Sequence, residues 1–124
     1  MNQKRPVNLD LRTLHFPVMA ITSIMHRVSG IIIFILLPIM IYFLQLSLGS
    51  KESYHHLLQL FDKSFYKLIL WGFLSALVYH FFAGVRHMIA DYGYGETVVI
   101  AKKTARLLLI LTVVSTVLLG VWVW

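Results

Sequence analysis

The sequence predicts an all-α membrane protein with three transmembrane helices and a cytoplasmic N-terminus. Three observations indicate this class: 59% of the 124 residues are hydrophobic, only 13% are charged, and three long stretches carry no charge. A soluble domain has about 45–50% apolar and about 25% charged residues. So short a chain cannot bury this much apolar surface in a core of its own. The length suits one membrane domain over residues 1–124.

The N-terminal part comprises a polar arm, residues 1–17, and a first span at about residues 20–49. Residues 28–50 carry no charge, and a span needs about 20 mainly apolar residues. Pro17 suits the first turn of a helix. Pro38 lies within the span and is expected to kink it. A polar loop is expected over residues 49–63.

The C-terminal half contains two further spans, at about residues 64–90 and 104–124. Between Lys67 and Arg86, the only ionisable side chain apart from tyrosine is His80. A second loop is expected over residues 91–103. After Arg106 nothing ionisable remains, which is typical of a membrane span.

The basic residues gather at the ends of the apolar runs and favour one orientation. The N-terminal side and the second loop together hold eight Lys and Arg residues, against three on the other face. Because cytoplasmic loops are enriched in Lys and Arg, the N-terminus is expected in the cytoplasm. Trp71, Trp122 and Trp124 then lie at the outer ends of their helices, as in an aromatic belt. Since the basic residues form no stripe, the net charge of +6 does not indicate nucleic-acid binding.

His80 is the residue within these charge-free stretches that most directly suggests chemistry, because an ionisable group in a membrane is costly. A neutral imidazole inside a helix bundle suits axial ligation of haem iron, with the other ligand from a neighbouring subunit. Gly84, on the same face, would let a flat macrocycle approach the backbone. The alternative is a histidine hydrogen-bonded to another helix, with Gly84 as a packing residue. Spacing alone favours that alternative.

A second polar group lies on the first span, where Ser23, His26, Arg27 and Gly30 fall within an arc of about 100°. A hydroxyl, an imidazole and a guanidinium there can bind a carbonyl headgroup, pair with a carboxylate or pass protons. Taken alone, these side chains are better explained as groups that snorkel to the lipid headgroups.

A third polar group, Arg86, His87 and Asp91, follows His80 in the sequence. His87 lies about 10 Å along the helix axis from His80, which puts His80 near the depth of the polar group on the first span. Two spans with polar groups at one depth favour a shared site. Asp91 is expected to form a surface salt bridge with Arg86 or Arg27. Three further histidines are expected to be ordinary surface residues: His15, His55 and His56.

Two longer motifs contain these residues. The first joins RPVNLDL at residues 5–11 to SIMHRVSG at residues 23–30, and the second is HFFAGVRHM at residues 80–88 followed by DYG at residues 91–93. On these motifs the chain resembles the cytochrome b556 membrane-anchor subunits of succinate dehydrogenase (respiratory complex II). One departure is Ala90, where that family usually has a bulky aromatic residue or Met.

The resemblance implies a role for each candidate site residue. His80 matches the axial ligand of haem b, a cofactor shared with a companion anchor subunit whose His is the second ligand. Ser23 and Arg27 match residues of the site for ubiquinone. His26 and Arg27 match groups close to the haem propionates.

The resemblance also implies partners. They are a second membrane-anchor subunit, an iron–sulfur subunit and an FAD flavoprotein, and the anchors form a hetero-oligomeric helix bundle. The chain has no cysteine, so it cannot itself hold an iron–sulfur cluster. By itself it should catalyse nothing. A bacterial inner membrane is the expected location, in preference to the mitochondrial inner membrane.

Three alternatives stay open. The first is the anchor of a fumarate reductase, which runs the reverse chemistry. The second is a small transport subunit that uses His80 as a proton site. The third is a plain structural anchor, in which every polar residue packs or snorkels.

Overall fold

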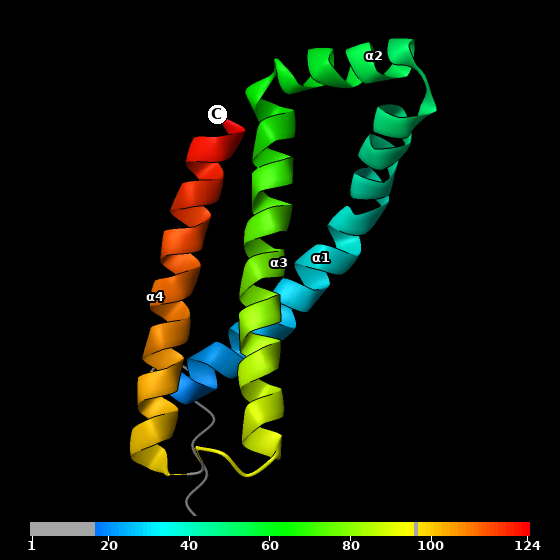
Figure 1. The fold of residues 1–124 in the computed structure, drawn as a ribbon. Coiled ribbons are helices and arrows are strands. Elements are labelled where there is room, and N and C mark those ends of the chain that lie inside the picture. The colour runs from blue at the N-terminus through cyan, green and yellow to red at the C-terminus, as the bar shows by residue number, and fades with distance from the viewer. Residues whose placement is uncertain (1–16, 96) are drawn as a thin grey trace, which may run out of the picture.

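The computed structural model describes residues 17–95 and 97–124, and its secondary structure is entirely helical (Figure 1). The helices are α1 (Val18–Gly49), α2 (Lys51–Phe61), α3 (Ser64–Asp91) and α4 (Val98–Val123). Three of them, α1, α3 and α4, are long and apolar enough to cross a membrane. The prediction of an all-helical protein with three candidate spans is therefore confirmed. The motif at residues 5–11 and His15 lie outside the described residues.

The prediction of a polar loop over residues 49–63 is wrong, because α2 occupies most of it. The hydroxyl of Ser50 accepts a hydrogen bond from the backbone N–H of Ser53 (3.1 Å), and the Ser53 hydroxyl accepts one from the N–H of Ser50 (2.8 Å). This capping box satisfies two donors at the start of α2. One face of the helix buries Leu57, while His55 and His56 are exposed, as expected for surface histidines.

The second connection is also shorter than the predicted loop over residues 91–103, because α3 continues to Asp91 and α4 begins at Val98. Thr97 caps α4: its hydroxyl accepts a hydrogen bond from the backbone N–H of Ile100 (3.4 Å). Gly93 and Gly95 have positive φ angles, of 84° and 79°. Glycine adopts this conformation without steric cost, which allows the tight turn between the two helices.

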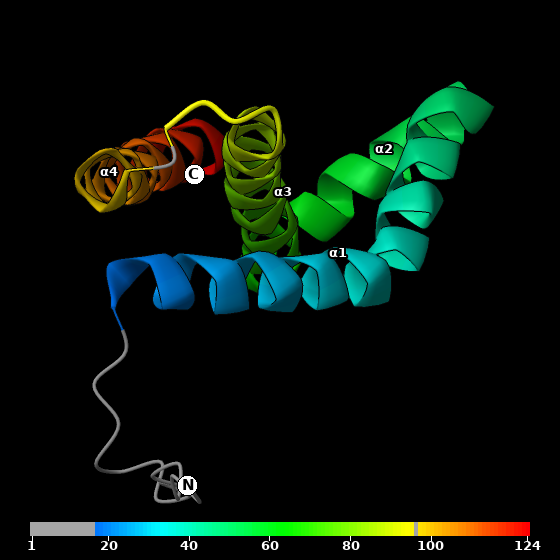
Figure 2. The same cartoon turned by 90° about the horizontal axis from the view of Figure 1, so that it is seen from below.

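Helix α3 is central and packs against both α1 and α4 (Figures 1 and 2). Helix α1 changes direction partway along its length (Figure 2), as expected for a helix with a proline, Pro38, in its interior. Its N-terminal half crosses α3 and reaches α4. The end of α4 lies beside the start of α3, since Trp71 Nε1 donates a hydrogen bond to the carbonyl of Thr116 (2.8 Å) and the Trp71 and Trp124 rings are 6.2 Å apart.

The main buried cluster is small and lies where the three long helices meet. Tyr79, Ala83 and Leu108 are buried there. The Tyr79 hydroxyl also donates a hydrogen bond to the backbone carbonyl of Thr22 (2.7 Å), which ties α3 to α1. Since Tyr79 precedes His80 and Thr22 precedes Ser23, this core holds the two predicted polar groups at one level.

Candidate functional site

The candidate site lies at the crossing of α1 and α3. His80 Nδ1 is 3.0 Å from the Ser29 hydroxyl oxygen and 3.2 Å from the backbone carbonyl oxygen of His26. The His26 and His80 rings stack, with centroids 4.3 Å apart and planes inclined by 26°. The polar groups of the two helices, which the sequence places at one level, are therefore in contact.

Glycine makes the close approach of His80 to α1 possible. A Cβ atom at Gly30 would lie 3.2 Å from Cε1 of His80, tighter than most contacts of real Cβ atoms. At Gly84, a Cβ atom would lie at an ordinary 3.7 Å from His26 Nε2. Within this chain, the His80 ring thus depends on Gly30, a residue that the sequence analysis placed on the polar arc without this role.

A polar cavity of about 150 Å³ adjoins the stacked histidines. Its polar walls come from Ser23, His26 and Arg27 on α1 and from Arg86 and His87 on α3. The rings of His26 and His87 have centroids 6.4 Å apart. The three α1 residues expected at the site therefore share one cavity, and His80 adjoins it through the His26 ring. Ser23 and Arg27 are exposed in this chain, so the cavity offers both groups to a partner or ligand.

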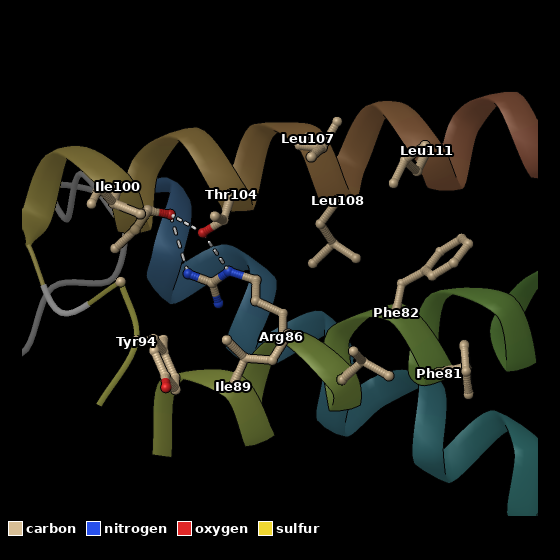
Figure 3. A pocket seen from close by; sticks show the side chains of 14 residues that line it. Phe81, Phe82, Arg86, Ile89, Tyr94, Ile100, Thr104, Leu107, Leu108 and Leu111 are labelled. Carbon is tan, nitrogen blue, oxygen red and sulfur yellow. Dashed lines mark hydrogen bonds between the residues drawn. The ribbon is translucent and has the colours of Figure 1, made fainter. Parts of the chain in front are cut away.

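The contacts of Arg86 differ from those that the sequence predicts. Its guanidinium donates to α4, from Nε to the Thr104 hydroxyl (3.1 Å) and from Nη2 to the carbonyl of Ala101 (3.2 Å) (Figure 3). Asp91 was expected to pair with Arg86 or Arg27, and among the described residues it pairs with neither. Residues 86 and 91 are five apart on α3 and do not share a face. Arg86 instead anchors α4 beside the polar cavity.

A larger hollow of about 590 Å³ lies between α3 and α4 (Figure 3). Most of its lining is apolar, including Phe81, Phe82, Leu107 and Leu111, and Arg86 and Thr104 provide polar groups. Size alone would favour this hollow as the site. Redox and proton chemistry needs converging donors and acceptors, and these converge in the smaller cavity. We therefore place the candidate site there.

The cavity has one unsatisfied group within the part of the chain that the structure describes: His26 Nε2 is buried without a hydrogen-bond partner. Leaving a buried polar atom unpaired costs about 1–3 kcal/mol, so this nitrogen suits a site that a bound molecule completes. The Arg27 guanidinium can pair with a carboxylate, and the Ser23 hydroxyl can donate to a carbonyl oxygen.

Ser29 is a residue of this site to which the sequence analysis gave no role. It is buried and contacts His80 directly. Its position next to Gly30 and about one turn after His26 is the only hint in the sequence. The side chain lies outside the predicted arc, which is why the pattern does not select it.

The chain is similar to known transmembrane subunits of succinate dehydrogenase. A family model described as the succinate dehydrogenase/fumarate reductase transmembrane subunit matches residues 1–119. The succinate dehydrogenase cytochrome b556 subunit of Coxiella burnetii is 46% identical to this chain, over 100% of both chains. The protein of that name from Paracoccus denitrificans is 32% identical over 92% of this chain and 88% of its own length. The cytochrome b560 subunit of Reclinomonas americana is 31% identical over 76% of this chain and 69% of its own length.

Proposed function

This chain belongs to the succinate dehydrogenase/fumarate reductase transmembrane subunit family, and we propose that it contributes one axial ligand to haem b and part of a site for ubiquinone. It is a multi-pass membrane subunit of succinate dehydrogenase. The observation that carries the proposal is the contact of His80 with Ser29 and His26, beside a cavity that contains Ser23 and Arg27.

The residues present fit haem b. The cytochrome b556 name of the relatives implies this cofactor. His80 would hold the haem iron, while His26 Nε2, which has no hydrogen-bond partner among the described residues, and the Arg27 guanidinium would bind the propionate carboxylates. When bound, haem b supplies a one-electron redox centre. His80 would hold the haem iron together with a His of the companion anchor subunit.

Ser23 and Arg27 serve the quinone. The Ser23 hydroxyl donates a hydrogen bond to a quinone carbonyl oxygen, which orients the ring. The Arg27 guanidinium stabilises the negative charge that develops on quinone oxygen during reduction. Both side chains are exposed in this chain, so the companion anchor and the iron–sulfur subunit complete the site.

The remaining chemistry takes place in the partners. Succinate is oxidised at FAD in the flavoprotein, and the iron–sulfur subunit carries the electrons to the quinone. We propose the inner membrane of a bacterium as the location and succinate oxidation as the direction. The cytochrome b556 relatives support that direction over fumarate reduction, because their names specify succinate dehydrogenase.

Arg27→Ala tests the quinone role. In the purified complex we expect a loss of ubiquinone reduction of about 10²–10³-fold, as for other groups that stabilise a developing anion. Succinate oxidation with an artificial acceptor that bypasses the membrane site should be unchanged. Arg106→Ala, also exposed and outside the cavity lining, is the matched control. Equal losses in both assays for Arg27→Ala would contradict the quinone role.

A further inference from the structure

We propose that Ser29 is a positioning residue for His80, which keeps the ring proton on Nδ1 and leaves Nε2 as the nitrogen that binds iron. This inference rests on the proposed function, in which His80 is the haem ligand.

Three contacts define the arrangement. The Ser29 hydroxyl donates a hydrogen bond to the backbone carbonyl of His26 (2.7 Å). His80 Nδ1 lies 3.0 Å from the same hydroxyl oxygen and 3.2 Å from the same carbonyl oxygen. Ser29 is only 5% exposed, so water does not compete strongly for its single hydroxyl proton.

Only one tautomer of His80 satisfies all three contacts. If Nδ1 carries the proton, it donates to the Ser29 oxygen and to the His26 carbonyl, while the Ser29 hydroxyl proton remains on that carbonyl. If Nδ1 carries no proton, its lone pair faces a lone pair of the His26 carbonyl oxygen, and the two repel each other. The Ser29 hydroxyl would then also have to donate its proton to Nδ1 and lose its hydrogen bond to the His26 carbonyl. The Nδ1–H form is therefore favoured, and Nε2 keeps its lone pair.

An iron ligand needs this form of the imidazole. The hydrogen bond made by one ring nitrogen decides which nitrogen can bind a metal, and it also fixes the ring orientation. Ser29 and the His26 carbonyl hold Nδ1 from α1, and Gly30 leaves room for the Cε1 edge of the same ring. Helix α1 thus orients a ligand that belongs to α3.

Ser29→Ala in the purified complex is the central variant. It removes the shorter of the two Nδ1 contacts, so the ring is held only by the carbonyl. Loss of such a supporting hydrogen bond typically weakens metal binding about 10–100-fold. We therefore expect haem per flavin to fall after prolonged detergent washing. The haem midpoint potential should shift, and the reduced haem should bind carbon monoxide, which requires a displaced axial ligand.

Two variants separate the hydroxyl from simple packing. Ser29→Thr keeps the hydroxyl and should restore haem retention and resistance to carbon monoxide. Ser47→Ala is the matched control, because Ser47 on α1 makes the same type of bond to its own helix, at 2.8 Å to the Leu44 carbonyl. It should behave like the parent protein. If Ser29→Ala does not assemble, Ser29→Cys replaces it, since a thiol leaves no cavity but is a weak acceptor for Nδ1–H and a weak donor to the His26 carbonyl.

The outcomes are distinct. Impairment in Ser29→Ala, or in Ser29→Cys, with recovery in Ser29→Thr supports the proposal. Parent-like haem retention, potential and carbon monoxide binding in the first variant overturn it, as does equal impairment in Ser29→Thr. His80→Leu is measured alongside: a normal haem spectrum in that variant overturns the proposed function itself. Loss of haem there together with a parent-like Ser29→Ala overturns the Ser29 role alone.

Discussion

At the residue scale, the His80 imidazole is held from two directions. Ser29 and the His26 carbonyl contact Nδ1, and the bare backbone of Gly30 lies against Cε1. A ligand whose rotamer is fixed before the metal arrives loses little conformational freedom on binding. In the proposed function His80 is therefore a haem ligand oriented in advance by α1, although α1 and α3 are far apart in sequence.

Gly30→Ala tests this close approach. The added methyl would lie 3.2 Å from His80 Cε1, and overpacking of this kind costs about 1–3 kcal/mol. We expect haem retention in the purified complex to fall about tenfold, because about 1.4 kcal/mol corresponds to a factor of ten. The ratio of haem to flavin measures the effect.

The control is Gly72→Ala in α3, where the added methyl meets nothing within 4 Å. Ala is a better helix former than Gly by about 1 kcal/mol, so this variant should assemble normally. Equal haem retention in both glycine variants would contradict a steric role for Gly30.

Sequence reasoning finds those site residues that share a helical arc, and it misses cross-helix partners. Ser23, His26 and Arg27 face one side of α1 and meet in the cavity. Ser29 lies off that arc, so only the crossing of α3 reveals its contact with His80. The sequence suggests Asp91 as an ion-pair partner of Arg86, but the hydrogen-bond partners of Arg86 lie on α4. These contacts depend on helix placement, which periodicity does not specify.

At the element scale, long helices are easier to predict than short ones. Three charge-free runs indicate α1, α3 and α4, because each is long enough to span a bilayer. Helix α2 has no such run. Its capping box pairs Ser50 with Ser53, whereas the usual signature has Glu or Gln at the second position. The sequence therefore lacks both signals of a helix here, which explains why a loop is predicted in place of α2.

Ser50→Ala tests the importance of this cap. Loss of an N-cap serine costs about 1 kcal/mol, which corresponds to about fivefold faster amide exchange across α2 if the helix opens locally. Hydrogen exchange followed by mass spectrometry measures this. Ser64→Ala is the control, since Ser64 begins α3, whose N-cap makes no side-chain hydrogen bond. Unchanged exchange in Ser50→Ala would contradict the capping role.

At the scale of the whole molecule, the chain forms an incomplete site. The cluster of Tyr79, Ala83 and Leu108 lies where the three long helices meet, a few apolar residues such as Phe43 and Leu57 are buried elsewhere, and most large apolar side chains are exposed. Lipid or neighbouring transmembrane helices must cover this surface. The cavity likewise presents Ser23 and Arg27 outward. We therefore expect the isolated chain neither to oxidise succinate nor to reduce quinone, in assays where the assembled complex does both.

The most direct test of the central claim is a reduced-minus-oxidised absorption spectrum of the purified complex with His80→Leu beside the parent. Leucine cannot bind iron, and its side chain leaves less room than alanine for a substituting water. We expect a b-type band in the parent, with dithionite and with succinate as reductants, and a lost or altered band in the variant. An unchanged band in His80→Leu would contradict the assignment of His80 as the haem ligand.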